Sequence, residues 1–439
     1  MVRGITVRLI VLIAVPMSFF NPFSGVLWYL WYSHFRPNDF IWPQYAFKTG
    51  ALLIASATLL GYTIFEMQYS PPRWRGLILA ALFWIWVALA TVFANDHSLA
   101  LGKLSEYTKI LVMTFLVAAV ATTEDRIRIM ITAMGASIGL LGARATAEFL
   151  LTGAQNKVVG VGGVELEGNE FALALNLGFS ILVGLSYVVS QRAARYGTRI
   201  MALFCAAAVV GTFSRSGFLG LASSVLLFAW YSPRRLLNLG ALCVVVIAVL
   251  PLLPQRALTR YQSIPTAAEL DPSAIARIQS WETGLQMIKA HPLFGVGPLN
   301  FQSQYSHYFL QKYMDAANYH PRAPHNAYVC LAAESGIPSM LLFIAFVGAT
   351  IVRMGRIRRR LLQWPGTERL AGYCLTIQIT LMVYLIPNFF ISRQNEDLMW
   401  HLVGISTGLA LLAESQLAAK DSIEDVPAPV MTNPVLAGT

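Results

Sequence analysis

Three ionisable side chains in mostly apolar surroundings have the types needed to move a phosphate-linked group. Arg215 lies in "GTFSRSGF", Arg277 lies in "SAIARIQSW", and His325 precedes the apolar run "NAYVCLAAESG". A guanidinium donates paired hydrogen bonds to phosphate. An imidazole titrates near neutral pH and can accept a proton there. We therefore predict an anion clamp of two arginines and a general base.

Each of these residues also has a simpler interpretation. Arg215 can hold a lipid headgroup, but an arginine on the charge-poor side of a membrane protein favours binding of an anionic ligand. Arg277 is almost as readily interpreted as a solvated helix residue. An isolated histidine near a helix start, such as His325, is usually a cap or a hydrogen-bonded core residue.

Five further polar residues are predicted to support the site: Arg144, Asn326, Arg322, Glu167 and Glu334. Glu167 follows a glycine-rich stretch where a loop meets a helix, so it can cap that helix or accept hydrogen bonds from sugar hydroxyls, and capping is favoured. Arg144 is four residues before Glu148, the spacing at which oppositely charged side chains on a helix pair.

Glu334 is an acid inside an apolar run, nine residues after His325. Nine residues turn a helix by about two and a half turns, so the two side chains are predicted to lie on opposite faces. Gly336 and Pro338 follow directly and predict a kink. We expect Glu334 to be structural, hydrogen-bonded to neighbouring helices.

The composition predicts an all-α polytopic membrane protein. Of 439 residues, 56% are hydrophobic and only 12% are charged, far from the balance of a soluble domain. The net charge of +10 does not indicate nucleic acid, because most arginines lie in short loops between apolar runs. The four cysteines all lie in apolar segments and are interpreted as packing residues. The sequence has no Asp-x-Asp pair, phosphate-binding loop or dinucleotide fingerprint, so no metal and no cofactor are expected.

The apolar runs predict about twelve transmembrane helices, with arginine-rich connections such as "EDRIR" and "RMGRIRRR" on the cytoplasmic face. Both termini are predicted to be cytoplasmic. Residues 4–33 are interpreted as one span broken near Asn21, although two crossings stay open. The predicted regions are a transmembrane bundle of about ten spans (1–253), a periplasmic loop domain (254–325), C-terminal transmembrane helices (326–415) and a disordered cytoplasmic tail (416–439).

The large loop is predicted to contain a helix that begins at Asp271 and ends before His291-Pro292. Its apolar residues recur at helical spacing, so one face is expected to lie on protein or membrane. These residues are Ile278, Trp281, Leu285 and Ile288.

Three motifs in order resemble the O-antigen ligase and polymerase superfamily of bacterial membrane glycosyltransferases. They are "GTFSRSGFLGL", "ARIQSWETGLQMIKAHPLFGVGPLNF" and "PHNAYVCLAAESGIPSMLLF". The stretches "FRPNDFIWPQYAFKTGALLIASATLLGY" and "GNEFALAL" resemble the O-glycosylation ligases associated with exosortase systems. The resemblance covers about residues 20–415, and Pro338 departs from it because many relatives carry a small residue there.

The resemblance implies a GT-C-like bundle in the bacterial inner membrane whose active site faces the periplasm. Such an enzyme takes a glycan from undecaprenyl diphosphate and transfers it to a hydroxyl of lipid A–core oligosaccharide, with inversion and without a metal. Membrane lipids surround it, and no nucleic acid is involved. Arg215 and Arg277 would hold the pyrophosphate, and His325 would be the base.

Alternatives remain within and outside this class. A Wzy-type polymerase transfers to a growing glycan and a protein O-oligosaccharyltransferase transfers to protein, and the sequence does not show acceptor specificity. A flippase or other transporter of lipid-linked glycans is less favoured, because it should show internal repeats or charges along several spans. The glycan structure and the oligomeric state are not readable from the sequence.

Overall fold

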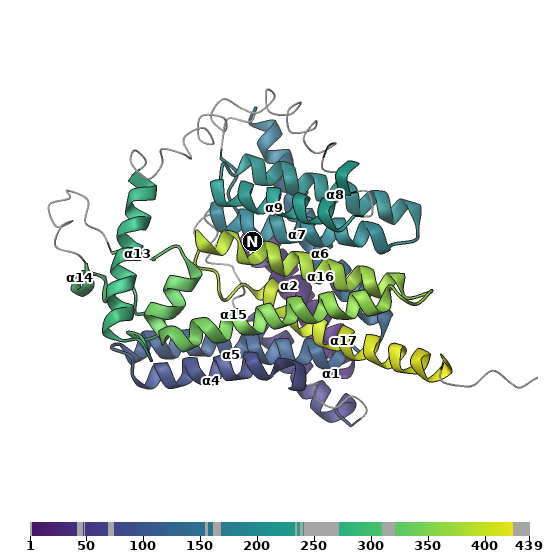
Figure 1. Ribbon diagram of the computed structural model, residues 1–439, viewed down its shortest axis with the longest axis horizontal. Helices are drawn as coiled ribbons and strands as arrows, with labels where there is room; N and C mark the ends of the chain where they lie inside the picture. The colour runs from purple at the N-terminus through teal and green to yellow at the C-terminus, as the bar shows by residue number, and fades with distance from the viewer. Residues whose placement is uncertain are drawn as a thin grey trace, which may run out of the picture.

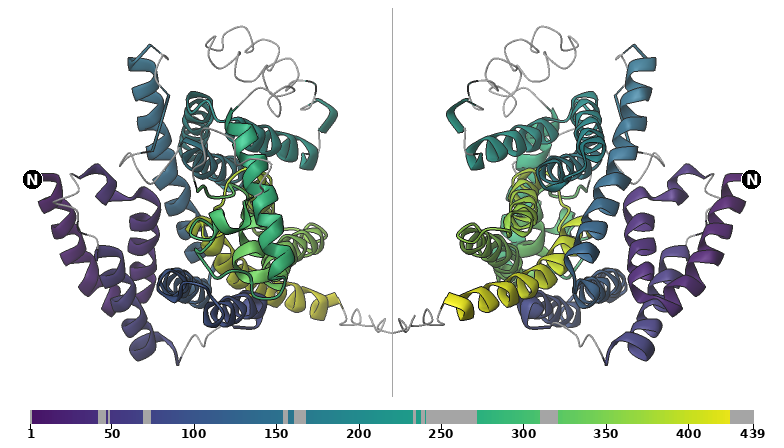
Figure 2. Two further views of the ribbon diagram at one scale, coloured as in Figure 1. Left: turned by 90° about the vertical axis from the view of Figure 1, so that its left-hand side faces the viewer. Right: turned by 90° about the vertical axis from the view of Figure 1, so that its right-hand side faces the viewer.

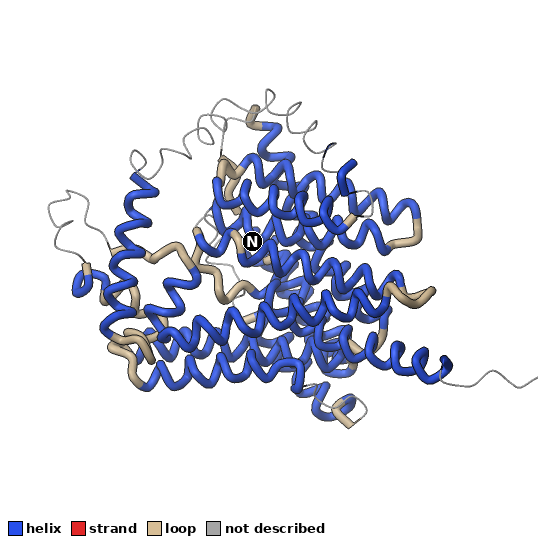
Figure 3. The backbone as a smooth tube through the Cα atoms, viewed as in Figure 1, coloured by secondary structure: helices blue, strands red, loops and turns tan. Residues whose placement is uncertain are grey.

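The computed structural model describes residues 2–41, 47, 49–68, 74–153, 157–160, 168–232, 235–237, 240, 272–309 and 321–424. Within these residues every regular element is helical (Figures 1 and 3). The longer helices are α1 (Val2–Phe20), α2 (Pro22–Phe35), α3 (Gly50–Gly61), α4 (Ile78–Val92), α5 (His97–Val120), α6 (Glu124–Leu151), α7 (Gly168–Val188), α8 (Arg192–Gly211), α9 (Arg215–Tyr231), α13 (Pro272–Ala290), α15 (Ala327–Leu361), α16 (Glu368–Leu385) and α17 (Asp397–Glu424). Short helical turns are η1 (Pro37–Phe40), η3 (Tyr62–Glu66), η4 (Trp74–Leu77), α14 (Tyr305–Tyr308) and η7 (Pro387–Phe389).

Eight helices in the described part of the chain are long and apolar enough to cross a membrane. They are α1, α4, α6, α7, α8, α15, α16 and α17, with α4 and α16 each extended by a short helical turn. The predicted all-α polytopic membrane protein is confirmed. The predicted total of about twelve spans stays a prediction, because one of those spans, 235–253, lies almost entirely outside the described residues.

Two helices form the centre of the bundle and two lie at its edge. The most apolar windows of α7 and α16 are 78% and 72% buried, against 28% for α1 and 22% for α8. Small residues allow the central helices to approach closely, as membrane helices require. A Cβ at Gly184 of α7 would lie 2.2 Å from the Thr376 hydroxyl of α16, so no larger residue fits there.

The arginine-rich connections meet at one end of the bundle, as predicted. Arg369 at the start of α16 is 3.2 Å from Glu124 at the start of α6. The Arg358 guanidinium near the end of α15 lies over the Tyr231 ring at the end of α9. The helix ends that were predicted to be cytoplasmic therefore share one face.

The N-terminal segment differs from the predicted single broken span. Helices α1 and α2 fold back on one another at Asn21, whose side chain caps α2. Arg3 at the start of α1 donates a hydrogen bond to the Phe40 carbonyl after α2, so the two helices form a hairpin. Figure 2 shows this hairpin with α3 along one side of the bundle. Pro22 at the first helical position explains why a new helix begins after Asn21, and α3 packs against both α1 and α2.

The ends of this hairpin also differ from the prediction that the N-terminus shares a face with the arginine-rich connections. Near the end of α2, the Ser33 hydroxyl donates to Asp397 at the start of α17. Asp397 lies at the bundle end opposite the arginine-rich connections, because Glu414 further along α17 pairs with Arg353 near the end of α15. Arg3 beside Phe40 therefore lies at the Asp397 end.

The C-terminal boundary also differs from the prediction. Helix α17 continues to Glu424, so residues 416–424, which were assigned to a disordered tail, are helical. Lys420 donates to the Pro365 carbonyl and lies over the Trp364 ring, which anchors the last turns of the helix. The rest of the predicted tail lies outside the described residues.

Candidate functional site

His325 lies directly before the N-terminus of α15, with its backbone in the left-handed region (φ 45°). Asn326 is the N-cap, and its Oδ1 accepts hydrogen bonds from the backbone N–H groups of Tyr328 and Val329, both at 3.0 Å. The N–H of Asn326 itself donates to the Ser392 hydroxyl at 3.0 Å. The peptide that follows the predicted base is thus fixed on both sides.

Helix α13 begins and ends where the sequence predicts and crosses the end of the bundle at a steep angle to α15 (Figure 1). The Trp281 indole donates to the Pro324 carbonyl at 2.7 Å, one residue before His325. Arg277 lies four residues before Trp281, so both share one face of the helix. The second predicted clamp residue is therefore carried on the helix face that contacts the chain beside His325.

The predicted apolar face of α13 is only partly correct. The residues buried on this helix are Ser280, Thr283, Gly284 and Met287. Leu285 is 49% exposed. A Cβ at Gly284 would lie 2.5 Å from Val329 of α15. Small and polar residues allow α13 to approach the first turn of α15 closely, a contact that apolar spacing alone does not reveal.

Arg215 is the first residue of α9, and Ser214 is its N-cap. The Ser214 hydroxyl accepts from the Gly217 N–H at 3.0 Å and donates to Asn169 Oδ1 of α7 at 2.6 Å. The turn that carries Arg215 is therefore pinned to the beginning of α7. Such a helix start can favour an anion.

The segment between α16 and α17, residues 386–396, contacts all three of these regions. A Cβ at Gly220 of α9 would lie 3.0 Å from Pro387. The ring centroids of Trp281 on α13 and Phe390 are 6.5 Å apart. Ser392 accepts from the Asn326 N–H as described above. The elements that carry Arg215, Arg277 and His325 thus converge on one connection at one end of the bundle.

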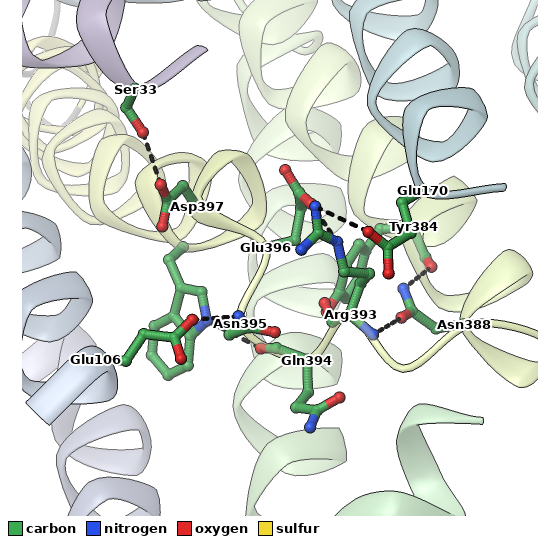
Figure 4. Close-up of polar contacts among 11 residues, drawn as sticks. Ser33, Glu106, Glu170, Tyr384, Asn388, Arg393, Gln394, Asn395, Glu396 and Asp397 are labelled. Carbon is green, nitrogen blue, oxygen red and sulfur yellow. Dashed lines mark hydrogen bonds and ion pairs between the residues drawn. The ribbon is translucent and has the colours of Figure 1, made fainter. Parts of the chain in front are cut away.

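A largely buried ionic cluster occupies this connection, and the sequence analysis missed it (Figure 4). The Arg393 guanidinium lies 3.5 Å from Glu170 and 3.6 Å from Glu396. Burial raises the pKa of the Glu396 carboxyl, and the Arg393 charge opposes this shift. The signal in the sequence was the run "SRQNED" between two apolar segments, where charged residues on the predicted outer face require partners.

Other contacts fasten the same connection to the bundle (Figure 4). The Tyr384 hydroxyl donates to the Arg393 carbonyl at 2.8 Å, and Asn388 accepts from the Arg393 N–H at 3.2 Å. Asn395 donates to Glu106 of α5. Consecutive residues therefore contact different helices, which leaves the segment little freedom to move.

The five predicted supporting residues have different surroundings. Arg144 lies 3.6 Å from Glu148, as the spacing predicted, and over the Phe40 ring. Asn326 is the cap described above. Arg322 is half-buried in the stretch before His325. Glu167 lies outside the described residues.

Glu334 is 7% exposed and accepts a hydrogen bond from the Phe301 N–H at 3.3 Å. Two residues later, Gly336 has φ 83° and breaks the regular helix, which confirms the predicted kink. The Leu293 carbonyl lies 1.7 Å from where a Cβ would be at Gly336. The Glu-x-Gly motif therefore holds the chain after α13, "LFGVGPLNF", against the kink of α15.

Among the described residues, no group of three or more His, Cys, Asp or Glu side chains is arranged to hold a metal ion. The cations that the structure describes at this end of the bundle are the side chains of arginines and lysines. Among them, Lys103 pairs with Glu106 at 2.8 Å, and the Lys157 side chain lies beside Gly168 at the start of α7.

The fold and this polar end of the bundle define a polytopic membrane protein with a candidate site at one membrane face. Comparison with known proteins adds the family. The O-antigen ligase family model matches residues 200–344, a region that contains Arg215, Arg277 and His325. A family of unknown function matches residues 2–164. No curated protein matches the chain significantly.

The match at residues 200–344 confirms the predicted resemblance to the O-antigen ligase and polymerase superfamily. The resemblance to the ligases associated with exosortase systems stays a prediction. The match supports glycosyl transfer of the O-antigen ligase or polymerase kind, with lipid-linked glycan and acceptor substrates in the membrane.

Proposed function

We propose that this protein transfers a glycan from undecaprenyl diphosphate to a hydroxyl of lipid A–core oligosaccharide, at the periplasmic face of the bacterial inner membrane. One observation carries the proposal. The three residues expected to do the chemistry lie within the matched family region, on elements that meet at the connection between α16 and α17.

In the proposed reaction, Arg215 and Arg277 bind the pyrophosphate of the donor. His325 accepts the proton of the acceptor hydroxyl while the oxygen forms a bond to the anomeric carbon. The bond from that carbon to the diphosphate breaks, and undecaprenyl diphosphate leaves with its charge stabilised by the two guanidinium groups. A single displacement inverts the anomeric centre. The positive charge that the leaving group needs comes from arginine, so the proposed reaction is metal-independent.

Glu334 has a structural part in this proposal. Its carboxylate accepts from a backbone N–H in the chain that follows α13, and no step of the reaction requires it. Its contribution is to keep α13, and with it Arg277, beside the start of α15.

The experiment that tests the proposal uses the purified full-length chain in lipid vesicles with an undecaprenyl-diphosphate-linked glycan. Three parallel reactions contain lipid A–core oligosaccharide, a pilin-like protein, or no added acceptor. Glycan on lipid A–core alone is the expected result. Glycosylated protein or a lengthened lipid-linked glycan would replace the proposed acceptor, and no transfer in any reaction would reject the proposed function.

A further inference from the structure

We propose that Ser392 and Arg393 are positioning residues that set His325 relative to the turn carrying Arg215. This inference rests on the proposed function and adds residues outside the matched family region to the working site. Its basis is a continuous path of contacts from the chain beside His325 to the turn that carries Arg215.

The first part of the path fixes the backbone next to His325, the predicted base. Ser392 accepts from the N–H of Asn326, the residue after His325. His325 has a backbone conformation that residues other than glycine adopt only uncommonly (φ 45°). Such a conformation persists where the surroundings determine it. The Ser392 hydroxyl is one of the groups that fix the peptide next to His325.

The second part of the path reaches the anion clamp. Arg393, the neighbour of Ser392, lies 3.5 Å from Glu170 of α7. Glu170 follows Asn169, which accepts from the hydroxyl of Ser214, the N-cap beside Arg215. A displacement of the Ser392–Arg393 segment therefore affects the beginning of α7 through the Arg393 side chain and the chain beside His325 through the Ser392 hydroxyl.

The charge balance argues for a positioning role rather than direct binding of phosphate. Two carboxylates, from Glu170 and Glu396, flank the Arg393 guanidinium, whose side chain is 21% exposed. A guanidinium neutralised in this way adds little attraction for an anion. It instead links two helices, and the backbone of Arg393 is fixed independently by Tyr384 and Asn388.

Positioning of this kind has a large effect on rate. A displacement of about 1 Å from the reactive geometry can lower a rate by about 10²-fold. Groups that act as one unit also give non-additive losses when they are removed together.

The test compares Ser392→Ala, Arg393→Gln and the double variant with the wild-type chain in vesicles. Ser392→Thr keeps the hydroxyl, and Arg353→Gln removes an exposed ion pair near the opposite end of the bundle. Initial rates of glycan transfer over a range of donor concentrations give kcat and KM. Binding of the undecaprenyl-diphosphate-linked glycan gives the number of competent sites per chain, so that loss of folded protein is separated from loss of rate.

We expect Ser392→Ala and Arg393→Gln each to lower kcat by about 10- to 100-fold, with donor binding and site number unchanged. The double variant should lose little more than the worse single variant, and Ser392→Thr should recover most of the rate. Arg353→Gln should leave kcat unchanged.

A loss in kcat that is proportional to the loss of competent sites would overturn the inference. The inference would also be overturned if the fold-losses in kcat of the two single variants multiply in the double variant. Ser392→Ala removes only a hydroxyl, so it tests the inference by itself if Arg393→Gln fails to fold. A wild-type kcat in Ser392→Ala would refute this inference alone. A wild-type kcat in His325→Gln would refute the proposed function itself.

Discussion

The two ends of the helical bundle carry charged residues in different ways. At the arginine-rich end the ion pair Arg353–Glu414 is exposed, with side chains 35% and 45% accessible, whereas Arg126–Glu66 is partly buried. At the His325 end, polar groups are held by several partners, as Arg393 is by Tyr384, Asn388 and Glu170. Exposed pairs contribute little to stability, whereas a buried polar group requires its partners. In the proposed function, the second end is the one preorganised for chemistry, and the comparison between the two ends can be tested by substitution.

The largest difference between the ends should be seen when arginines are removed. We expect Arg215→Ala and Arg277→Ala each to lower kcat/KM about 10²- to 10³-fold, because each removes a group that stabilises charge on the leaving diphosphate. Arg353→Ala at the opposite end is the matched control and should transfer normally. The measurement is initial transfer rate over a range of donor concentrations. Equal activity in all three variants would remove the distinction between the ends.

A smaller effect is expected on stability, within a single helix. Gly336→Ala should lower the free energy of unfolding by about 2 kcal/mol or more, because it strains a positive φ and places a methyl group against the Leu293 carbonyl. Gly348→Ala lies in the same helix with no heavy atom within 4 Å of the new Cβ, so it should be neutral or slightly stabilising.

Thermal unfolding in detergent checks this pair of variants. Equal melting temperatures would show that the contact between the kink and the chain after α13 contributes nothing to stability.

Helix caps at the two ends give the smallest and most direct comparison. Asn326 caps α15 at the His325 end, and Thr123 caps α6 at the arginine-rich end. Replacing either by alanine should cost about 1 kcal/mol of stability. Only Asn326→Ala should also lower kcat, since it loosens the residue after His325. A parallel loss of transfer in Thr123→Ala would mean that activity merely follows stability.

Local signals in the sequence were enough to predict the helical class, the shared face of the arginine-rich connections, and the bounds of α13. These depend on composition, capping residues and proline, which act over a few residues. The kink at Gly336 was predicted for the same reason.

Features that depend on which segments meet in space were not predicted. The hairpin at Asn21 and the buried face of α13 depend on neighbours that are distant in the chain. The Arg393 cluster joins residues on α7 and the connection before α17, more than 200 positions apart along the chain. A polar run between two apolar segments signalled that partners exist, but it did not identify them.

The central claim is that His325 is the base that accepts the proton of the acceptor hydroxyl. The most direct test is the pH dependence of kcat for wild-type protein and His325→Gln, both in vesicles with saturating donor and lipid A–core acceptor. We predict a wild-type kcat that rises with pH as the imidazole loses its proton. The variant should be about 10²- to 10⁴-fold slower and lack that rise. A variant with the wild-type rate and pH profile would contradict the account.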